Sequence, residues 1–405
     1  MTFVRTIVAP FTLLASLTGF AATHAHAENA AFTACIAELK TQALAQNVSA
    51  GTVNDVLSRA TYIDRVVDSD RAQPEFNKTF TTYYQQRVTS KRIEAGRKLL
   101  VTHRALLDRL QQQTGVPPHY LLALWGLETN FGNYFGKLPI PSALATLACD
   151  SRRTQFFSGE LLAILKIIDA GDLNADELRG SWAGAIGHMQ FMPTTYLAYA
   201  VDGDGDGRRD LFGSVSDALT SGGHYLRELG WQKGFRWGRE VKLPAGFDYA
   251  TTGIEQRQPL SAWAERGVTD AFGNRLPSLP LESAIVLPTG ATGPAFIIYE
   301  NFHILMQWNR SQSYALAVGL LADRINGAGR LQQPLPSVKS IQVSRAQTLE
   351  LQRSLNELGF ASGKPDGVVG PATTRAIRNF QASRGVTADG YPSRATFQLL
   401  EQMPK

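Results

Sequence analysis

One glutamate stands alone in an otherwise apolar stretch of the chain. Glu128 lies in the segment from Leu121 to Gly132 (LLALWGLETNFG), and helical spacing places Leu124 and Trp125 one turn before it on the same face. A carboxyl against aliphatic and indole surface loses solvation, which raises its pKa and keeps it protonated near neutral pH. Such a group suits general acid catalysis of glycosidic cleavage. The alternative is a carboxylate that pairs with a neighbouring arginine or points into water.

A glycine-rich motif follows about fifty residues later, from Ser181 to Pro193 (SWAGAIGHMQFMP). Its small residues, such as Gly184 and Gly187, let one stretch of backbone approach another closely. The side chain of Gln190 offers a donor and an acceptor, which suit amides or sugar hydroxyls. The glycines alone are equally consistent with a tight turn packed between helices.

The third candidate is an acidic loop, Asp202 to Asp210 (DGDGDGRRD), in which carboxylates alternate with glycines as in a calcium-binding loop. Its twelfth position is Gly213, where an EF-hand carries a bidentate glutamate, so the closing ligand is expected to be Asp217 or water. The alternative is a solvated acidic turn. The candidate metal-binding residues are Asp202, Asp204, Asp206, Arg208, Asp210 and Asp217.

The elements that must position these groups are mostly helical. Apolar spacing predicts one large helical unit over residues 28–326, with a small inserted sheet over 240–302, where short apolar runs are separated by Gly, Pro and Asn turns. Helical stretches are predicted over 30–60, 75–113, 119–129, 155–169, 190–200, 216–229 and 311–326.

A separate module is predicted at the C-terminus. Residues 327–342 are rich in Gly, Pro and Gln and are expected to form a linker, and residues 343–405 form a compact module. Asp366-Gly367 and Asp389-Gly390 each begin a turn that feeds a helix. The apolar residues that predict a small three-helix core are Leu351, Leu355, Leu358, Ile377 and Phe380.

The first 27 residues have the pattern of a secretory signal peptide. Arg5 precedes an apolar stretch over 7–22, and Ala25-His26-Ala27 has the small-x-small form of a cleavage site. The alternative is an N-terminal membrane anchor. In an oxidising exported compartment the two cysteines, Cys35 and Cys149, are expected to form a disulfide; the alternative is two inert buried thiols.

The composition bounds the class of protein. The chain has 405 residues, 44% hydrophobic and 19% charged, which excludes a disordered, collagen-like or polytopic membrane chain and exceeds a single typical domain. Forty basic against 35 acidic residues give a net charge of +5. That mild, scattered excess suits an anionic polymer as a partner and is too weak to indicate nucleic acid.

Three motifs in the order Glu128–Gly132, Gly184–Pro193 and Trp308–Val318 resemble the lytic murein transglycosylases of the B type, and the resemblance extends over most of residues 35–326. It implies a mainly α (α+β) protein with a lysozyme-like helical catalytic body. It also implies cleavage of the MurNAc–GlcNAc β-1,4 bond of peptidoglycan. In that family the muramoyl C6 hydroxyl replaces water as the nucleophile, which leaves a 1,6-anhydro end, and one glutamate acts first as acid and then as base. By motif this glutamate is Glu128.

The residues alone leave other functions open. A hydrolytic muramidase that uses water is one alternative, although it ordinarily needs a pair of carboxylates flanking the bond. A non-catalytic peptidoglycan-binding scaffold and a calcium-regulated protein are the others.

The resemblance also implies a set of substrate-binding residues: Ser181, Gln190, Phe191, Tyr225, Trp308, Asn309, Tyr314, Arg152, Arg153 and, by a weaker match, Tyr83. Trp308 stands where relatives often carry Tyr, so it keeps a ring for sugar stacking and loses the hydroxyl. The two arginines suit the carboxylates of peptide stems, but a surface pair that caps a helix is equally consistent with their pattern, and the aromatic residues fit a core as well. The similarity implies a structural Ca²⁺ in the acidic loop and no organic cofactor.

The C-terminal module resembles the peptidoglycan-binding domain of the three-helix type. From Val343 onward it carries 8 basic and 5 acidic residues, which suits an anionic wall polymer. The combined expectation is a periplasmic monomer that binds peptidoglycan glycan strands, does not bind nucleic acid, and has no transmembrane anchor once the signal peptide is removed.

Overall fold

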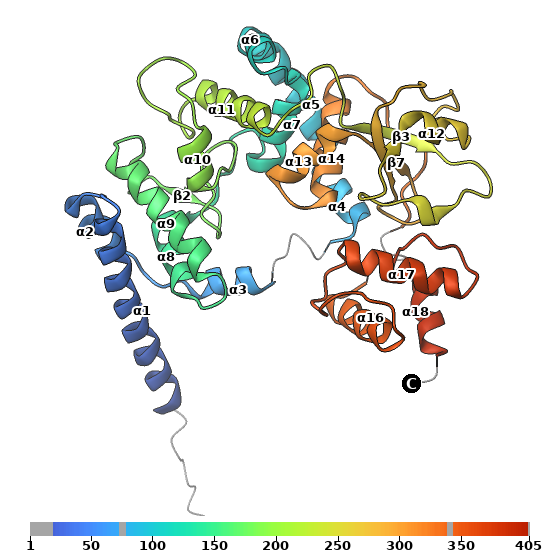
Figure 1. Cartoon of the computed structure of the whole chain (residues 1–405). Helices are drawn as coiled ribbons and strands as arrows, with labels where there is room; N and C mark the ends of the chain where they lie inside the picture. The colour runs from blue at the N-terminus through green and yellow to red at the C-terminus, as the bar shows by residue number, and fades with distance from the viewer. Residues whose placement is uncertain (1–18, 73–77, 338–342, 404–405) are drawn as a thin grey trace, which may run out of the picture.

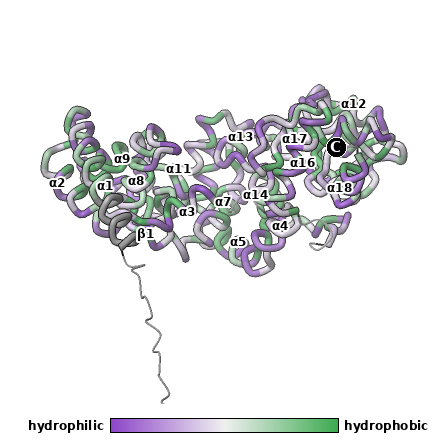
Figure 2. Tube along the Cα trace, turned by 90° about the horizontal axis from the view of Figure 1, so that it is seen from below, coloured by the Kyte–Doolittle hydropathy of each residue, from purple (hydrophilic) through white to green (hydrophobic). Residues whose placement is uncertain are grey.

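The computed structural model describes residues 19–72, 78–337 and 343–403, with side chains from residue 30 onward. The chain is mainly helical with two small antiparallel sheets, as the sequence predicts. Figure 1 shows α1, α2, α8 and α9 at one end, α5, α7, α13 and α14 in the middle, and β3, β7 and α12 at the other end, with the C-terminal helices below that end. The view from below in Figure 2 keeps this order and shows hydrophobic and hydrophilic residues interspersed along the whole tube.

The first group of helices is held together by a disulfide. Cys35 and Cys149 are bonded with their Cα atoms 5.9 Å apart, which joins α1 to the end of α8 and confirms the predicted pairing. At the other end of the group, the Asp169 carboxylate accepts hydrogen bonds from the Ser49 N–H (3.1 Å) and the Thr52 hydroxyl (2.6 Å) at the start of α2. The helices are α1 (Gly19–Ala45), α2 (Ala50–Ser58), α3 (Asp64–Ala72), α8 (Ile140–Cys149) and α9 (Thr154–Asp169).

The central group surrounds α7, which is buried on every face from Tyr120 to Leu127. A helix that is hydrophobic all round belongs in a core, and α7 packs against both α5 and α14. The helices of this group are α4 (Phe80–Arg87), α5 (Ser90–Thr102), α6 (Arg104–Thr114), α7 (Pro118–Thr129), α10 (Pro193–Tyr199), α11 (Val215–Glu228), α13 (Glu300–Trp308) and α14 (Gln312–Ile325).

The inserted sheet is antiparallel and five-stranded, in the order β4-β6-β7-β3-β5. Neighbouring residues of its inner strands alternate between two cores: Ile285 and Ile297 pack with Trp263, whereas Phe296 joins the core of the helical body. Both faces are therefore covered. The elements are β3 (Gly238–Lys242), the 3₁₀ turn Tyr249–Thr251, β4 (Gln258–Pro259), α12 (Leu260–Glu265), β5 (Thr269–Asp270), β6 (Glu282–Val286) and β7 (Ala295–Ile298).

A second, two-stranded sheet pairs β1 (Leu138–Pro139) with β2 (Arg179–Gly180). Because β2 ends at Gly180, this pairing fixes the point where the glycine-rich motif begins.

The C-terminal module consists of α16 (Arg345–Glu357), α17 (Pro371–Ser383) and α18 (Arg394–Glu401). Ser344 and Gln347 form a capping box that begins α16. Leu351, Leu355, Ile377 and Phe380 are buried and Leu358 packs against them, which confirms the predicted three-helix core.

Several predicted helices differ in the structure, and the differences have local causes. The stretch 30–60 divides at Asn47, which has a φ of 63°, into α1 and α2. The stretch 75–113 divides at the capping residues Thr89 and His103 into α4, α5 and α6, and its first residues, 75–77, lie outside the described part. The helix predicted over 190–200 begins only at Pro193. Helices α3, α8, α12 and α13 were not predicted.

The predicted signal peptide, residues 1–27, lies largely outside the described residues, because the first described residue is Gly19 at the start of α1. In the described part, no helix combines the length and apolar character that membrane crossing requires.

The disulfide generates the first prediction. A double Cys35→Ser/Cys149→Ser variant should unfold with a free energy lower by about 2–4 kcal/mol, because the lost crosslink spans a sequence separation of 114 residues and no longer restricts the unfolded chain. Urea denaturation of the oxidised protein with and without reductant measures the difference. The double variant is the control, since reductant should leave its midpoint unchanged. Two free thiols in the unfolded, unreduced wild type would contradict the pairing.

Candidate active site

The helix that carries Glu128 ends immediately after it. The C-cap of α7, Asn130, has a φ of 52°, Phe131 has a φ of 61°, and Gly132 has a φ of 78°, so three consecutive residues adopt the left-handed region. A Cβ on Gly132 would lie 2.3 Å from the imidazole of His188, which leaves room for glycine alone. The chain therefore turns away sharply after Glu128, so the residue keeps part of its surface exposed at the helix end while protein surrounds its carboxyl.

Two donors from other helices bind the carboxyl of Glu128. The Trp308 indole N–H, at the end of α13, donates to Oε1 over 3.1 Å, and the Tyr314 hydroxyl, in the first turn of α14, donates to the same oxygen. Because both donors occupy Oε1, the proton of the neutral acid belongs on Oε2. Trp308 was predicted to offer only a ring for sugar stacking. Its indole N–H is a hydrogen-bond donor all the same, although the tyrosine hydroxyl is missing.

Burial raises the pKa of Glu128 to about 7, against its ordinary value of 4.5. The hydrogen bonds from Tyr314 and Trp308 and the charge of Arg87 oppose this shift. Burial, together with the neighbouring Glu128 carboxyl, also raises the pKa of the Tyr314 hydroxyl well above its usual range, so Tyr314 remains a donor. The raised pKa predicted for Glu128 is confirmed. The hydrogen bonds that Trp308 and Tyr314 donate to its carboxyl were not predicted.

The glycine-rich motif forms a tight turn beside α7. Ile186 and Phe191 form an antiparallel bridge, and Gln190 between them has a φ of 49°. At Gly187, also in the left-handed region, a Cβ would lie 2.5 Å from the Leu211 carbonyl oxygen. The Gln190 amide donates to the Gly187 carbonyl (3.0 Å), and the Ser181 hydroxyl accepts from the Ala185 N–H (3.1 Å). Both polar side chains thus stabilise the turn itself.

His188 joins this turn to α7, a role that the sequence analysis missed. The Trp125 indole donates to His188 Nδ1 (2.9 Å), and the Thr129 hydroxyl donates to the His188 carbonyl (2.9 Å). Burial lowers the pKa of His188 to about 4, so the ring is neutral and accepts at Nδ1. The position of His188 inside the glycine-rich motif could have indicated a structural role. The spacing of the motif could not indicate that Trp125 is its hydrogen-bond partner.

Aromatic rings gather beside the carboxyl. Ring centroids of Phe191 and Tyr225 lie 5.4 Å apart, those of Phe191 and Trp308 5.4 Å, and those of Tyr225 and Trp308 5.2 Å, and Tyr199 stacks on Tyr225. Phe191 is 2% exposed, so its ring packs beneath those of Tyr225 and Trp308 and is not itself accessible. Tyr225 and Trp308 keep part of their surface exposed.

Two further predicted residues lie on the helices that carry the donors to Glu128 or pack against them. Asn309 is the C-cap of α13, and its side-chain oxygen accepts from the Ser311 N–H (3.2 Å). Tyr83 is buried on α4, contributes to the raised pKa of Tyr314, and has the Arg87 guanidinium 5.5 Å from its ring centroid. The structure therefore brings Trp308 and Tyr314 to Glu128 and places Tyr83 beside Tyr314, whereas Asn309 makes only local contacts at the end of α13.

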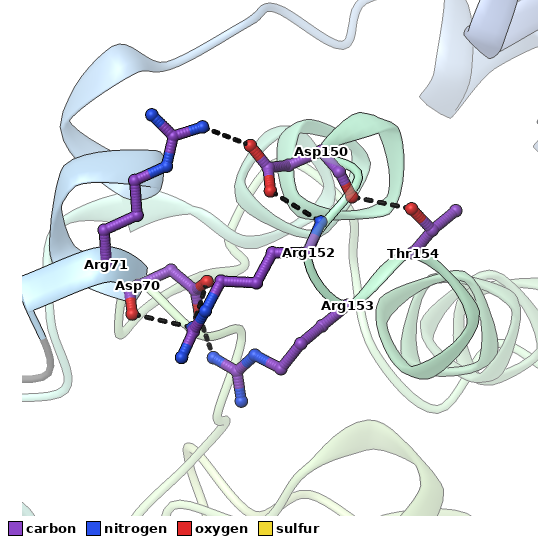
Figure 3. A network of polar contacts seen from close by, with 6 residues as sticks. All are labelled: Asp70, Arg71, Asp150, Arg152, Arg153 and Thr154. Atoms are coloured by element: carbon purple, nitrogen blue, oxygen red, sulfur yellow. Dashed lines mark hydrogen bonds and ion pairs between the residues drawn. The ribbon is translucent and has the colours of Figure 1, made fainter. Parts of the chain in front are cut away.

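The predicted arginine pair has a partner that the sequence analysis did not name. Arg152 and Arg153 both form ion pairs with Asp70 from α3, as Figure 3 shows, with Arg152 Nη1 2.5 Å from Asp70 Oδ2. Asp70 is 3% exposed, whereas the side chains of Arg152 and Arg153 are 40% and 34% exposed. The buried Asp70 carboxylate therefore holds both guanidinium groups, and the two arginine side chains keep part of their surface exposed to solvent.

The acidic loop brings three of the six predicted ligand residues together. Carboxylate oxygens of Asp202, Asp204 and Asp217 lie within 4.8 Å of one another. Asp217 is fully buried, which raises its pKa, and it accepts from the Gly203 N–H (2.8 Å) and the Asp210 N–H (2.8 Å). A buried carboxylate beside two others fits a hard cation with oxygen ligands.

The other three predicted residues lie outside that group of three carboxylates. The Asp206 carboxylate accepts from the Arg208 N–H (2.8 Å), and Asp210 accepts from the Gly213 N–H (2.8 Å). The Arg208 guanidinium donates to the Asp172 carbonyl (3.4 Å). The loop continues into Leu211, whose carbonyl accepts from the His188 N–H (2.9 Å), so it supports the glycine-rich turn directly.

Comparison with known proteins places this geometry in a family. Residues 31–323 match the model of the transglycosylase SLT domain, and residues 344–400 match a putative peptidoglycan binding domain. The chain is 31% identical over 290 residues to the membrane-bound lytic murein transglycosylase B of Escherichia coli strain K12, which covers 67% of this chain and 77% of that protein.

Solved structures agree. The crystal structure of SltB3 from Pseudomonas aeruginosa in complex with NAG-anhNAM-pentapeptide matches with a TM-score of 0.88 and 40% identity, over 92% of this chain and 99% of that one. The Escherichia coli lytic transglycosylase Slt35 in complex with calcium matches with a TM-score of 0.62 and 29% identity, over 72% and 92%. The chain therefore belongs to the lytic murein transglycosylase B family, whose members act on peptidoglycan, and its lysozyme-like helical body is the transglycosylase domain of that family.

Proposed function

We propose that this lytic transglycosylase cleaves the MurNAc–GlcNAc β-1,4 bond and leaves a 1,6-anhydro-MurNAc end, with Glu128 as the single acid and base. The observation that carries the proposal is the asymmetric Glu128 carboxyl, with two donors on Oε1 and a pKa of about 7. An acid with this pKa is substantially protonated near neutral pH and gives up its proton readily.

In the first step, the Oε2 proton passes to the glycosidic oxygen as the bond to the muramoyl C1 breaks. The carboxylate that results is stabilised by the Trp308 and Tyr314 donors and by the charge of Arg87, the same three interactions that oppose the raised pKa. Tyr314 keeps its own proton in the process, since its pKa lies well above its usual range.

In the second step, the Glu128 carboxylate takes the proton of the C6 hydroxyl while that oxygen bonds to C1, which closes the anhydro ring and regenerates the acid. A retaining or inverting hydrolase would place a second carboxylate across the bond. The charge that lowers the pKa of Glu128 is that of Arg87, a cation and not a second carboxylate, which supports a single-carboxylate mechanism.

The surrounding residues are proposed to hold the substrate. Tyr225 and Trp308 offer partly exposed rings for sugar contacts. Gln190 and Asn309 are proposed to bind substrate through the positions of their amide groups that the local hydrogen bonds leave. Arg152 and Arg153, anchored by Asp70, present exposed guanidinium groups to peptide-stem carboxylates. The buried residues Phe191, Tyr314 and Tyr83 support these contacts, and the hydrogen bond of Ser181 to the turn assigns it the same kind of role.

The rest of the chain is proposed to serve the same reaction. Residues 1–27 act as a signal peptide that delivers a monomeric enzyme to the periplasm, and 28–326 form the catalytic region. After the linker 327–342, the module 343–405 binds the wall polymer and raises the local enzyme concentration on it. A Ca²⁺ held by Asp202, Asp204 and Asp217 would stabilise the loop behind the glycine-rich turn.

The mechanism predicts that Glu128→Gln lowers sacculus digestion by at least about 10²-fold, because Gln carries no transferable proton. Mass spectrometry of the wild-type products should show anhydro-ended muropeptides, lighter by one water than the products of hydrolysis. Glu94→Gln, at an exposed position on α5, is the control and should keep wild-type turnover. Wild-type rates in Glu128→Gln would favour the scaffold, and reducing-ended products from wild type would favour the muramidase.

The raised pKa of Glu128 predicts a pH-dependent stability difference. The folded protein holds this proton up to about pH 7, whereas the unfolded chain releases it near pH 4.5, so wild-type stability falls as the pH rises across this window. Glu128→Gln stays neutral and should therefore be more stable than wild type above pH 7, by on the order of 2–3 kcal/mol. Urea denaturation at pH 4 and pH 8 measures this; an equal difference at both pH values would contradict the raised pKa.

The acidic loop predicts a structural response to calcium. Adding Ca²⁺ to chelator-treated protein should raise the melting temperature by several degrees, since an ion that binds only the folded state stabilises it. Asp217→Asn should abolish the shift, whereas Asp206→Asn, outside the group of three carboxylates, should retain most of it. A melting temperature that ignores Ca²⁺ would refute the site, and turnover that switches with micromolar Ca²⁺ would indicate regulation instead.

A further inference from the structure

A cavity of about 430 Å³ separates the C-terminal module from the catalytic body. Its walls come from the start of α4, the segment 252–256, the α13–α14 connection and, on the module side, from α16, α17 and the turns before α17 and α18. The module is fixed against the body beside it, because the Ala291 N–H donates to Asp389 Oδ2 over 2.9 Å. The cavity is therefore composite: neither part forms it alone.

The charge of this composite cavity is strongly unbalanced. Five cationic side chains line it against two acidic ones. Both acids are already engaged: Glu255 pairs with Arg375 at 3.6 Å, and Asp389 accepts from the Ala291 N–H and the Gln381 amide. The cationic residues are Lys78, Arg310, Arg345, Arg375 and Arg378.

Arg378 is the most buried of these five cationic residues. It is 9% exposed, the only arginine among the buried side chains of the described residues. Its Nη2 donates a hydrogen bond of 3.3 Å to the Thr252 hydroxyl, and its buried Nε has no hydrogen-bond partner among the described residues. Carboxylates form ion pairs with the half-buried Arg153 and Arg236, but within the described part no direct ion pair reaches Arg378. The charge of Asp389 acts on Arg378 from beyond ion-pair distance, so an anion that binds the buried guanidinium directly would stabilise it further.

Two glycines keep the space beside this guanidinium open. A Cβ on Gly253, in the body, would lie 3.6 Å from Arg378 Nη1, and one on Gly390, in the module, would lie 3.3 Å from Nη2. Apolar residues, among them Ile254, Val286 and Met306, complete the lining. The cationic side chains can bind a carboxylate, and the aliphatic surface can accept small side chains. Together they suit a short acidic peptide.

The cavity adjoins the catalytic residues along the chain. The segment 310–313 lines the cavity, and it is flanked by Trp308 and Tyr314, the two donors to Glu128. We propose that the composite cavity is a second binding site, which takes an acidic peptide branch of the wall polymer through carboxylate contacts with Arg378, Arg310 and Arg345. The choice of a wall peptide rests on the proposed function; the preference for a peptide carboxylate rests on the cavity itself.

The test measures binding of a labelled, sugar-free acidic pentapeptide of the wall type to the full chain by fluorescence anisotropy. Arg310→Gln, at an exposed position, and Arg378→Met should each weaken binding by about tenfold or more, the loss of one charge-assisted hydrogen bond. Arg353→Gln removes the same charge from an exposed position of α16 outside the cavity and should leave binding unchanged. Because Arg310 and Arg378 lie in different parts of the chain, both losses together identify a composite site.

The disaccharide NAG-anhNAM without peptide serves as competitor. It should not displace the pentapeptide from the cavity, whereas displacement would place the peptide in the sugar site and overturn the proposal. Undetectable pentapeptide binding, or equal binding by wild type and Arg310→Gln, would also overturn it. These outcomes are separate from the failure of the proposed function, because the products of sacculus digestion report on Glu128 whether or not the cavity binds peptide.

Discussion

The chemistry of this protein depends on two hydrogen bonds that meet at one oxygen of a buried carboxyl. Trp308 and Tyr314 make the two oxygens of Glu128 unequal, so that one accepts and the other holds the proton. A carboxyl in water has no such preference, because solvent exchanges freely between its oxygens. In the proposed mechanism the same donors stabilise the charge once the proton has left, which would let one residue serve in both halves of the reaction.

That arrangement requires three helix ends to meet. Glu128 lies in the last turn of α7, Trp308 ends α13 and Tyr314 lies in the first turn of α14, and α7 packs along α14. The chain can leave the site only through left-handed backbone at residues 130–132, packed against His188 of the glycine-rich turn. Leu211, which directly follows the acidic loop, accepts from the His188 N–H, so the loop is connected through His188 to the helix end that carries the acid.

The sequence predicted the parts of this unit better than the contacts between them. Apolar spacing predicted the helical body, the inserted sheet and the three-helix core, because burial follows periodicity. The isolation of Glu128 among apolar residues predicted its raised pKa. Contacts between distant segments left no such pattern: Asp70 beneath the arginine pair lies 82 residues from Arg152, and His188 lies 63 residues from Trp125. The indole donor of Trp308 was missed because a ring was expected only to stack.

The placement of the terminal module makes it more than a tether. A tether on a flexible linker raises local concentration without regard to orientation. Here Asp389 accepts from the backbone of the body, and the backbone of the linker itself is held, because the Gln332 and Gln333 N–H groups donate to the Glu240 carboxylate over 2.8 and 2.7 Å. A docked module presents its cations at a set distance from the 310–313 segment and hence from the donors to Glu128. Wall polymer bound between module and body would consequently approach the acid from one direction, and orientation as well as concentration would favour cleavage.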